Sequence, residues 1–421
     1  MKLVEQHLCC EGLGNLEWIE VGLRSALHAD ATRMLEGLLN DPQLKVAGDE
    51  KCPGEKRMGA QSKEVQCLFG KLRLRRNYYY DAQRGRGRYP LDEALGLHNG
   101  YTPGVARLIC RAAGRDSYGA GSGDLKAYAG LEVSARQLNR MVERIGPRMR
   151  AELEAQGVEV ETKAVPRLYV SCDGTGVPMR REELEGVAGK QPDGTAKTKE
   201  VKTGCVFTQH PVDGEEPFRD CDSTSYVATL RRSGEFGTLL RKEAFRRGMG
   251  RAEEIVFIAD GAVWIWEVAR INFPGAVEIL DYYHAREYLT VIVEILFGKK
   301  SEAGARKLER WKELFFEDEI EQVIQQARVL SAAMTGDAKL VNAKINYFEN
   351  NKHRMKYGTY RQKGYFYGSG VIEAGCKSVI GKRAKQSGMF WSSPGVENVL
   401  AIRTALHSNR FDSYWDHKNA A

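Results

Sequence analysis

Two short apolar runs, each ending in an Asp-Gly pair, constrain the fold of this chain most strongly. The runs are Arg167–Cys172 (RLYVSC), followed by Asp173, and Glu254–Ala259 (EIVFIA), followed by Asp260. Apolar runs of this length and composition are typical of buried strands. An Asp followed by Gly at a strand end presents its carboxylate with little steric cover. One Asp-Gly is a common turn, whereas two at matching fold positions indicate an acidic site.

Further strands and helices are predicted around these two runs. Their order is three strands, helix, strand, helix, strand, helix, which is the order of an RNase H-like α/β core with a mixed five-stranded sheet and flanking helices. In such a sheet the first and fourth strands are neighbours, which would place Asp173 beside Asp260. The remaining strands are expected at Glu200–Thr208, Pro217–Asp222 and Ala276–Leu280, and the helices at Ser223–Arg247, Val263–Asn272 and Ala285–Phe297.

A third acid is expected from a helix packed on the same sheet edge. Two-metal phosphoryl transfer needs hard oxygen ligands that converge within a few ångströms. Glu373 begins such a helix, which continues through Ala384. The polar stretch Ser301–Lys356 before it predicts an all-helical insertion. Beyond it, Pro394–His407 predicts a closing amphipathic helix, and Trp391 either packs on the core or stacks on a base.

The N-terminal part of the chain predicts a helix around Glu17–Leu39 and then a small basic hairpin. Apolar and polar residues alternate over Glu64–Tyr80, with the turn expected at Gly70-Lys71. The polar face of this hairpin carries Arg73 and Arg75, which are candidates for contacts with the DNA backbone. A small edge sheet without a ligand explains the same pattern.

Residues 117–150 predict two helices joined by a short turn that contains glycine. Ser134 and the glutamine three residues later form a capping box at the start of the second helix. This outline is that of a helix-turn-helix. The second helix exposes Arg136, Asn139 and Arg140, which suit contacts with DNA grooves and phosphates. An ordinary helical hairpin is the alternative.

Charge is concentrated in two segments of a chain whose formal net charge is only +7. Residues 71–90 hold seven Lys or Arg against one acid, and residues 351–385 hold nine against one, which is Glu373. Two basic patches on an otherwise balanced chain favour a polyanionic partner. Two solvated surface segments are the alternative.

Cysteine and hydropathy patterns predict a cytoplasmic protein that makes no membrane contact. The nine cysteines include no CxxC pair, which argues against a disulfide scaffold. The N-terminus carries early charges and lacks the apolar core of a signal peptide. The apolar run Leu289–Phe297 is too short to span a bilayer.

Four stretches resemble the bacterial insertion-sequence transposases of the ISKra group, which are DDE enzymes related to the Mutator-like superfamily. They are SCDGTGVPM, FIADGAVWIW, LDYYHAREYL and GSGVIEAGCKSVIGKRAKQSGMFW, and the similarity extends over nearly the whole chain. The resemblance implies that Asp173, Asp260 and Glu373 hold two Mg²⁺ or Mn²⁺ ions. It implies cleavage at transposon ends, followed by attack of the released 3′-hydroxyl on target DNA. The implied partners are double-stranded terminal repeats and target DNA, bound by a homodimer or higher oligomer at the bacterial nucleoid.

The same resemblance points to further residues, and this chain departs from the family pattern in one place. Relatives carry a Cys- or Asp-x-x-His signature after the second Asp, matched by Asp281 and His284. His284 could be a structural residue, a contact or proton carrier at the scissile phosphate, or, least in keeping with Mg²⁺, a metal ligand. Where relatives have a CxxC after paired tyrosines, this chain has Asp81 and Arg84, so a zinc site is not expected there. Basic residues after Glu373 are candidates for holding the DNA backbone: Lys377, Lys382, Arg383 and Lys385.

The expected plan has six segments. Two other functions remain open beside transposition, namely a DNA-binding protein derived from such an element and an RNase H-like nuclease without strand transfer. The segments are an N-terminal helix (1–60), the hairpin unit (61–100), the helix-turn-helix-like region (101–160), the first part of the core (161–300), the helical insertion (301–360) and the completion of the core (361–421).

Overall fold

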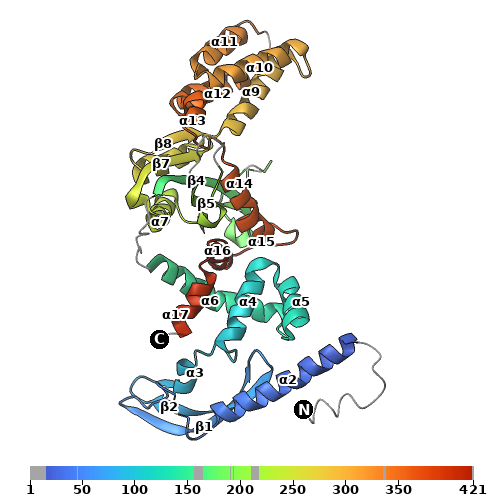
Figure 1. The fold of residues 1–421 in the computed structure, drawn as a ribbon, viewed down its shortest axis with the longest axis vertical. Coiled ribbons are helices and arrows are strands. Elements are labelled where there is room, and N and C mark those ends of the chain that lie inside the picture. The colour runs from blue at the N-terminus through green and yellow to red at the C-terminus, as the bar shows by residue number, and fades with distance from the viewer. Residues whose placement is uncertain are drawn as a thin grey trace. The chain divides into compact units, whose positions relative to one another are not determined.

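The computed structural model is mixed α/β and divides into two compact units (Figure 1). The first unit is Met1–Ile145 with Trp415–Ala421, and the second is Gly146–Tyr414. The structure describes residues 16–44, 46–155, 165–189, 191–192, 194–209, 218–334 and 338–419. The start of the chain, on which the expected absence of a signal peptide rests, lies outside the described residues.

The first unit contains a three-stranded antiparallel sheet in the order β1-β2-β3. The predicted hairpin is confirmed, with β1 (Glu55–Gln66) paired to β2 (Lys71–Asp81), and a short β3 (Arg86–Arg88) is added. Along β2, Leu72 and Leu74 are buried while Lys71, Arg73 and Arg75 are exposed. Strand β1 begins at Glu55, before residue 61, where the hairpin unit was expected to begin.

Helix α2 (Leu16–Leu39) protects one edge of this sheet. The backbone N–H of Arg73 donates to the Glu36 carboxylate at 2.8 Å, and that of Arg75 donates to Asn40 Oδ1 at 2.7 Å. Side chains from α2 and the residue after it therefore satisfy donors that an exposed edge strand would leave open for association.

The predicted pair of helices joined by a glycine turn is also present in the first unit. Helix α5 (Tyr118–Ala129) ends at Gly130, whose φ of 66° is left-handed. Helix α6 (Ala135–Ala155) opens with the expected capping box, in which the Ser134 N–H donates to Gln137 Oε1 at 2.8 Å. Two further helices precede this pair, α3 (Pro90–Ala94) and α4 (Pro103–Arg115).

The second unit is built on the expected mixed five-stranded sheet, in the order β6-β5-β4-β7-β8. Strands β4, β7 and β8 run parallel, and β5 and β6 complete the sheet by antiparallel pairing. The first and fourth strands of the unit, β4 and β7, are neighbours in this sheet, as expected. The strands are β4 (Val165–Pro178), β5 (Thr198–Thr208), β6 (Ser225–Thr229), β7 (Ala252–Ala259) and β8 (Val277–Leu280).

Helices make up the rest of the second unit, and the described part of 301–356 is helical apart from its turns. Their bounds are α7 (Ser233–Arg246), α8 (Val263–Asn272), α9 (Tyr282–Phe297), α10 (Glu302–Phe316), α11 (Ile320–Ala332), α12 (Ala338–Asn351), α13 (Tyr357–Gln362), α14 (Gly370–Gly375), a π-helical turn (Cys376–Gly381), α15 (Lys382–Ala384) and α16 (Ser393–His407). Helix α17 (Phe411–Asn419) begins in the second unit and ends in the first. Short 3-10 turns occupy Arg181–Glu183, Cys221–Ser223, Met249–Arg251 and Lys352–Arg354.

Two expected elements are wrong. The strand predicted at Pro217–Asp222 is, over its described residues, an irregular segment with one isolated bridge at Arg219 and a 3-10 turn. The third strand is instead β6, taken from the start of the predicted helix Ser223–Arg247, because Ser225–Thr229 pairs with β5. Pro217 itself lies outside the described residues.

The helix predicted at Pro394–His407 is present as α16, but it is neither the amphipathic helix nor the closing helix that was expected. Helix α16 is buried along nearly its whole length, including polar residues such as Asn398 and Arg403, and α17 follows it. Glu397 on α16 accepts hydrogen bonds from Thr229 Oγ1 at 2.8 Å and from the Leu230 N–H at 2.6 Å. Near the end of α16, Ser408 Oγ accepts from the Tyr226 N–H at 2.9 Å. Helix α16 therefore covers the edge strand β6.

Helices α7 and α14 pack on opposite faces of the sheet. A Cβ on Gly204 of β5 would lie 2.6 Å from Leu240 of α7. On α14, a Cβ on Gly375 would lie 2.6 Å from the ring of Tyr226, which neighbours the residue that pairs with Gly204. Since successive strand residues point to opposite faces, the α14 face also carries Asp173, which is paired with Thr203.

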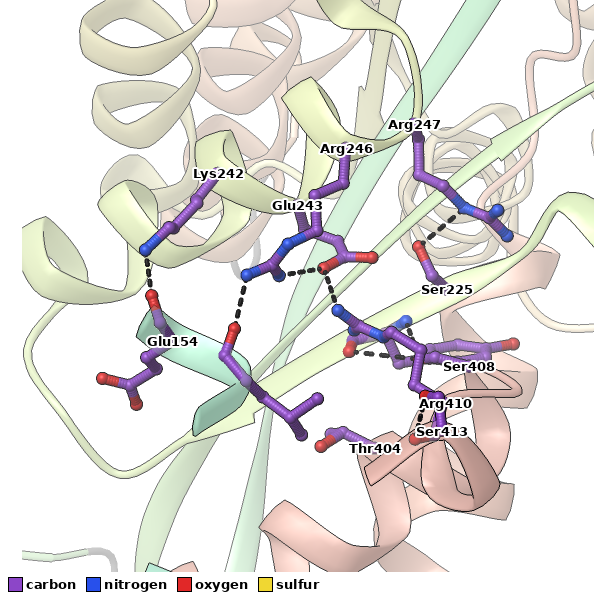
Figure 2. Close-up of polar contacts among 12 residues, drawn as sticks. Glu154, Ser225, Lys242, Glu243, Arg246, Arg247, Thr404, Ser408, Arg410 and Ser413 are labelled. Carbon is purple, nitrogen blue, oxygen red and sulfur yellow. Dashed lines mark hydrogen bonds and ion pairs between the residues drawn. The ribbon is translucent and has the colours of Figure 1, made fainter. Parts of the chain in front are cut away.

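A buried carboxylate ties α7 to the loop before α17 (Figure 2). Glu243 is 2% exposed, and its Oε2 lies 3.0 Å from Arg246 Nη1 and 3.0 Å from Arg410 Nη1. Burial is the main cause that lowers the pKa of Arg410, and the neighbouring arginines add to it. One buried acid thus compensates cations from two segments that are far apart in sequence.

Candidate functional site

Asp173 and Asp260 lie beside each other on two adjacent parallel strands. Asp260 directly follows β7 as expected, whereas Asp173 lies within β4, because that strand does not end at Asp173 but continues to Pro178 by pairing with β5. Ser171 of β4 is paired with Ile258 of β7, and each aspartate comes two residues later. The alternation of strand side chains then directs both carboxylates to the same side. The apolar runs fold in this way because Val, Ile and Phe fill the interior, and Val170 and Phe257 are fully buried.

The surroundings of the Asp173 carboxyl disfavour its ionised form. Burial raises its pKa, and the negative charge of Asp260 raises it further. The Gly174 N–H, which donates to Asp173 Oδ1 at 2.6 Å, and the nearby His284 act in the opposite direction. A buried carboxyl beside a like charge is stabilised by a cation, so this pair favours binding of positive charge.

Helix α14 brings Glu373 to the face that carries Asp173. The Cys376 thiol donates to Asp173 Oδ2 at 3.5 Å, and burial together with the Asp173 charge raises the pKa of this thiol to about 12. Cys376 is buried. Glu373 is half-buried, and its Oε1 accepts from Ser369 Oγ at 3.4 Å.

Asp281 connects the elements that carry the acidic residues and His284. Its backbone N–H donates to the carbonyl of Ala259, the residue before Asp260, at 2.8 Å. Its carboxylate is fully buried and accepts from the N–H of His284 at 2.5 Å and from the N–H of Ser369. The sequence prediction gave Asp281 no role of its own, although Asp281 directly follows β8 as Asp260 directly follows β7.

His284 lies in the first turn of α9, close enough to the acidic pair for its charge to act on Asp173. It is half-buried, and its ring is 6.3 Å from that of Tyr288. This position is compatible with the structural role and with the role beside a phosphate.

The three predicted metal ligands are not gathered into one cluster. No three His, Cys, Asp or Glu side chains within the described ranges lie close enough together to hold a metal ion. The chemistry of the pair nevertheless suits a hard divalent cation, because carboxylate oxygens are the ligands that Mg²⁺ prefers. Asp173 and Asp260 therefore fit one metal ion by residue type and placement, whereas Glu373 is turned toward Ser369.

The basic residues after Glu373 divide into two groups. Lys377, Lys382 and Lys385 are exposed, and the Lys385 ammonium contacts Thr175 of β4. The prediction that Arg383 contacts DNA is wrong for this conformation, because Arg383 is fully buried. Its guanidinium lies 5.0 Å from the ring centroid of Trp391 and 3.6 Å from Met389 Sδ.

Trp391 belongs to the core, as the first of its two interpretations expected. It is 8% exposed, and its indole N–H donates to the Ala384 carbonyl at 3.0 Å. Base stacking on this ring is therefore excluded in this conformation.

The other predicted DNA-contacting residues lie in the first unit. Arg136 and Arg140 are exposed on α6, while Asn139 is half-buried and donates to Glu143 at 2.8 Å. Arg73 and Arg75 are exposed on β2.

Asp81 and Arg84, which stand where relatives are expected to have the two cysteines of a CxxC, lie at the turn after β2. Asp81 Oδ1 accepts from the N–H groups of Gln83 at 2.9 Å and Arg84 at 3.1 Å, which closes the turn between β2 and β3. A carboxylate therefore stabilises this turn, where relatives are expected to have thiolates.

Comparisons with known proteins place the chain near one family. A model of an uncharacterised protein family (UPF0236) matches residues 16–188. The "UPF0236 protein in vanSb 3'region" of Streptococcus gallolyticus is 21% identical over 371 residues, which is 84% of this chain and 75% of that protein. The chain is similar to these proteins.

A solved structure was also matched, the Drosophila P element transposase strand transfer complex. The match covers 74% of this chain and 80% of that one, at 9% identity and a TM-score of 0.25. A TM-score this low does not establish a shared fold. Separately, no helix in the described part of the chain has both the length and the apolar character needed to span a bilayer.

Proposed function

We propose that this chain is a DDE transposase with an RNase H-like core, which cleaves DNA at transposon ends and transfers the released strand into target DNA. The observation that carries the proposal is the pair Asp173 and Asp260 on adjacent parallel strands, with a helix bearing Glu373 packed on the same face. The proposed cofactor is Mg²⁺ or Mn²⁺, as two ions.

The residues around the pair have distinct tasks in this proposal. Divalent cations, when bound, supply the Lewis acidity that activates the attacking oxygen and stabilises the leaving one. Asp173 and Asp260 supply oxygen ligands whose mutual repulsion favours cation binding. His284 lies where it can contact the scissile phosphate. Asp281 keeps the ends of β7, α9 and α14 together through its three hydrogen bonds.

DNA binding is assigned to surfaces outside the acidic pair. The exposed lysines Lys377, Lys382 and Lys385 suit phosphate contacts beside the reacting strand. In the first unit, helices α5 and α6 act as a helix-turn-helix, with Arg136, Asn139 and Arg140 toward DNA. The basic face of β2 adds backbone contacts, and the protein acts on DNA as a homodimer or higher oligomer.

One observation favours a second candidate, a transposase-derived DNA-binding protein without catalysis. Glu373 is hydrogen-bonded to Ser369, and the three carboxylates are not assembled in the described residues. In the transposase proposal, DNA and metal draw Glu373 toward the pair. In the alternative, the acidic residues remain apart and only binding survives.

Asp173→Asn separates these two functions. The substitution removes a charge and a preferred Mg²⁺ ligand with little change in volume, so folding and DNA binding should persist while Mg²⁺-dependent nicking at the element's ends falls to background. Asp222→Asn, an exposed aspartate, is the matched control. Wild-type protein that binds end DNA and never nicks it with Mg²⁺ or Mn²⁺ would establish the alternative.

A further inference from the structure

A groove of about 560 Å³ lies between α8 and α12. It begins at Gly261, the residue directly after Asp260, and includes Trp266 on α8 and Asn346 and Asn350 on α12. A volume of this size is within the range of sites that bind small organic molecules. A ligand in the groove would therefore lie next to any group held at Asp260.

The lining of the groove contains one buried donor that lacks an acceptor. Trp266 is 7% exposed, and its indole N–H has no hydrogen-bond partner among the described residues. The Tyr347 hydroxyl is instead bound by the backbone of Gly261, and the Tyr347 ring packs so closely on this glycine that an added Cβ would lie 2.0 Å from it. A buried donor such as the Trp266 indole N–H is costly unless a ligand or water satisfies it.

The walls of the groove are electrically balanced. Arg354 stacks 4.0 Å from the centroid of the Trp266 ring, and its Nε donates to Glu278 at 2.6 Å. The remaining charges in the lining are Glu267 and Arg270, one of each sign. A lining without surplus positive charge is unsuited to holding a phosphate, and it favours an uncharged ligand.

The open side of the groove is lined by amides and an exposed apolar side chain. Asn346 and Asn350 are exposed and lie one helical turn apart on α12. Val263, opposite them on α8, is 76% exposed. Amide side chains can donate and accept at once, which matches the edge of a nucleobase. An apolar side chain and aromatic rings match its faces.

We propose that this groove receives one unpaired nucleobase of the DNA strand held at the acidic pair. The inference rests on the proposed function, which places a phosphodiester beside Asp260. A base inside a duplex is stacked between its neighbours and cannot enter a protein groove. The base next to that phosphodiester therefore reaches the groove only after leaving the stack. Asn346, Asn350 and the Trp266 indole then read its edge.

The test compares three duplexes of one sequence by fluorescence anisotropy, in EDTA so that no cleavage occurs. One duplex is fully paired, one has a single unpaired adenine, and one has an abasic residue in the same place. Wild-type protein should bind the adenine duplex more tightly than the abasic one. Asn346→Ala and Asn350→Ala should each reduce that preference about two- to tenfold, the effect of one hydrogen bond.

Two further variants complete the experiment. Trp266→Phe removes the indole N–H and keeps an aromatic ring, so it should reduce the preference as well. Gln325→Ala removes an exposed amide from α11, outside the groove, and should leave the preference unchanged. Should Trp266→Phe fail to fold, the two exposed asparagine variants decide the outcome alone.

The results separate the groove from the catalytic proposal. Equal binding of the adenine and abasic duplexes by wild-type protein would overturn the inference, even if the protein cleaves DNA with Mg²⁺. An adenine preference that survives both asparagine substitutions would also overturn it. An adenine preference lost in the variants, in a protein that never cleaves, would support the groove and contradict the catalysis.

Discussion

The carboxylate of Asp281 accepts a hydrogen bond from the backbone N–H of Ser369, 88 residues later in the chain. Ser369 is the N-cap residue of α14, and Asp281 is the N-cap residue of α9. The same aspartate donates its own N–H to Ala259, beside Asp260. One buried residue therefore links the elements that carry Asp260, His284 and Glu373: its backbone N–H binds the end of β7, and its side chain binds the starts of α9 and α14.

Asp281→Ala should destabilise the protein and reduce nicking together. The substitution removes a helix cap, worth roughly 1 kcal/mol. It also leaves a second buried N–H unsatisfied, at a further cost of about 1–3 kcal/mol. Urea unfolding measures the loss, and Glu287→Gln, at an exposed position on α9, is the control. An Asp281→Ala variant with the stability and nicking rate of the wild type would show that the connection is dispensable.

Asp173→Asn should stabilise the metal-free protein at neutral pH. The raised pKa of Asp173 means that its ionised form is disfavoured in the folded state, so removing the charge favours folding. The gain should shrink as pH falls and the wild-type carboxyl is protonated. Mg²⁺ at a hundred times its Kd should stabilise the wild type by about 2.7 kcal/mol, and the variant by less. Thermal unfolding with and without Mg²⁺ measures both effects, and equal Mg²⁺ stabilisation would remove Asp173 from the ligand set.

Lys382 and its neighbour Arg383 should affect DNA binding differently. Lys382 is exposed, so Lys382→Ala should reduce the slope of log affinity against log salt by about 0.9, the value for one phosphate contact. Arg383 is buried under Trp391, so Arg383→Met should lower stability and leave the slope unchanged. Anisotropy titrations at several salt concentrations measure the slope. A slope that falls only in the Arg383 variant would reverse the assignment.

Glu243→Gln should cost about 3–5 kcal/mol of unfolding free energy, the usual effect of breaking a buried ion pair. The variant leaves Arg246 and Arg410 in a buried position with no carboxylate to compensate them. Glu235→Gln, at an exposed position on the same helix, should be nearly neutral. Urea unfolding of the two variants provides the comparison, and similar midpoints would mean that the cluster contributes little.

Glu183→Gln should make the protein less sensitive to acid. Hydrogen bonds from Ser393 and Lys199 lower the pKa of Glu183 to about 2, below its ordinary value of 4.5. A depressed carboxyl pKa contributes stability that is present above pH 4.5 and is lost as pH falls toward 2. The difference in stability between wild type and variant should therefore shrink over this range. Glu182→Gln, exposed next to it, controls for the change in net charge.

The strands that position Asp173 and Asp260 could be predicted because their information is local, and each apolar run is long enough to specify a buried strand. The Asp-Gly pair marks the end of β7 only, because β4 continues through Gly174 to Pro178 by pairing with β5. Strand β6 was missed because it is short and has an edge position. Its five residues are held by pairing with β5 and by Glu397 and Ser408, which are distant in sequence.

The side-chain arrangement of the site depended on contacts that no local pattern contains. Arg383 stands between lysines in sequence and resembles them, yet the approach of Trp391 buries it. The orientation of Glu373 toward Ser369 is likewise set by packing. Asp281 could have been found from sequence, because it directly follows an apolar strand as Asp260 does.

The position of α16 has a consequence for how the chain is made. Strand β6 is synthesised early in the second unit, but the helix that satisfies its outer edge comes only at Ser393–His407. During synthesis, the outer edge of β6 therefore stays open while the residues between β6 and α16 are being made. Such an edge is a template for pairing with another chain, and contacts this distant in sequence form slowly. The nascent protein should thus depend on chaperones, or on rapid completion of translation, more than its stability when complete would suggest.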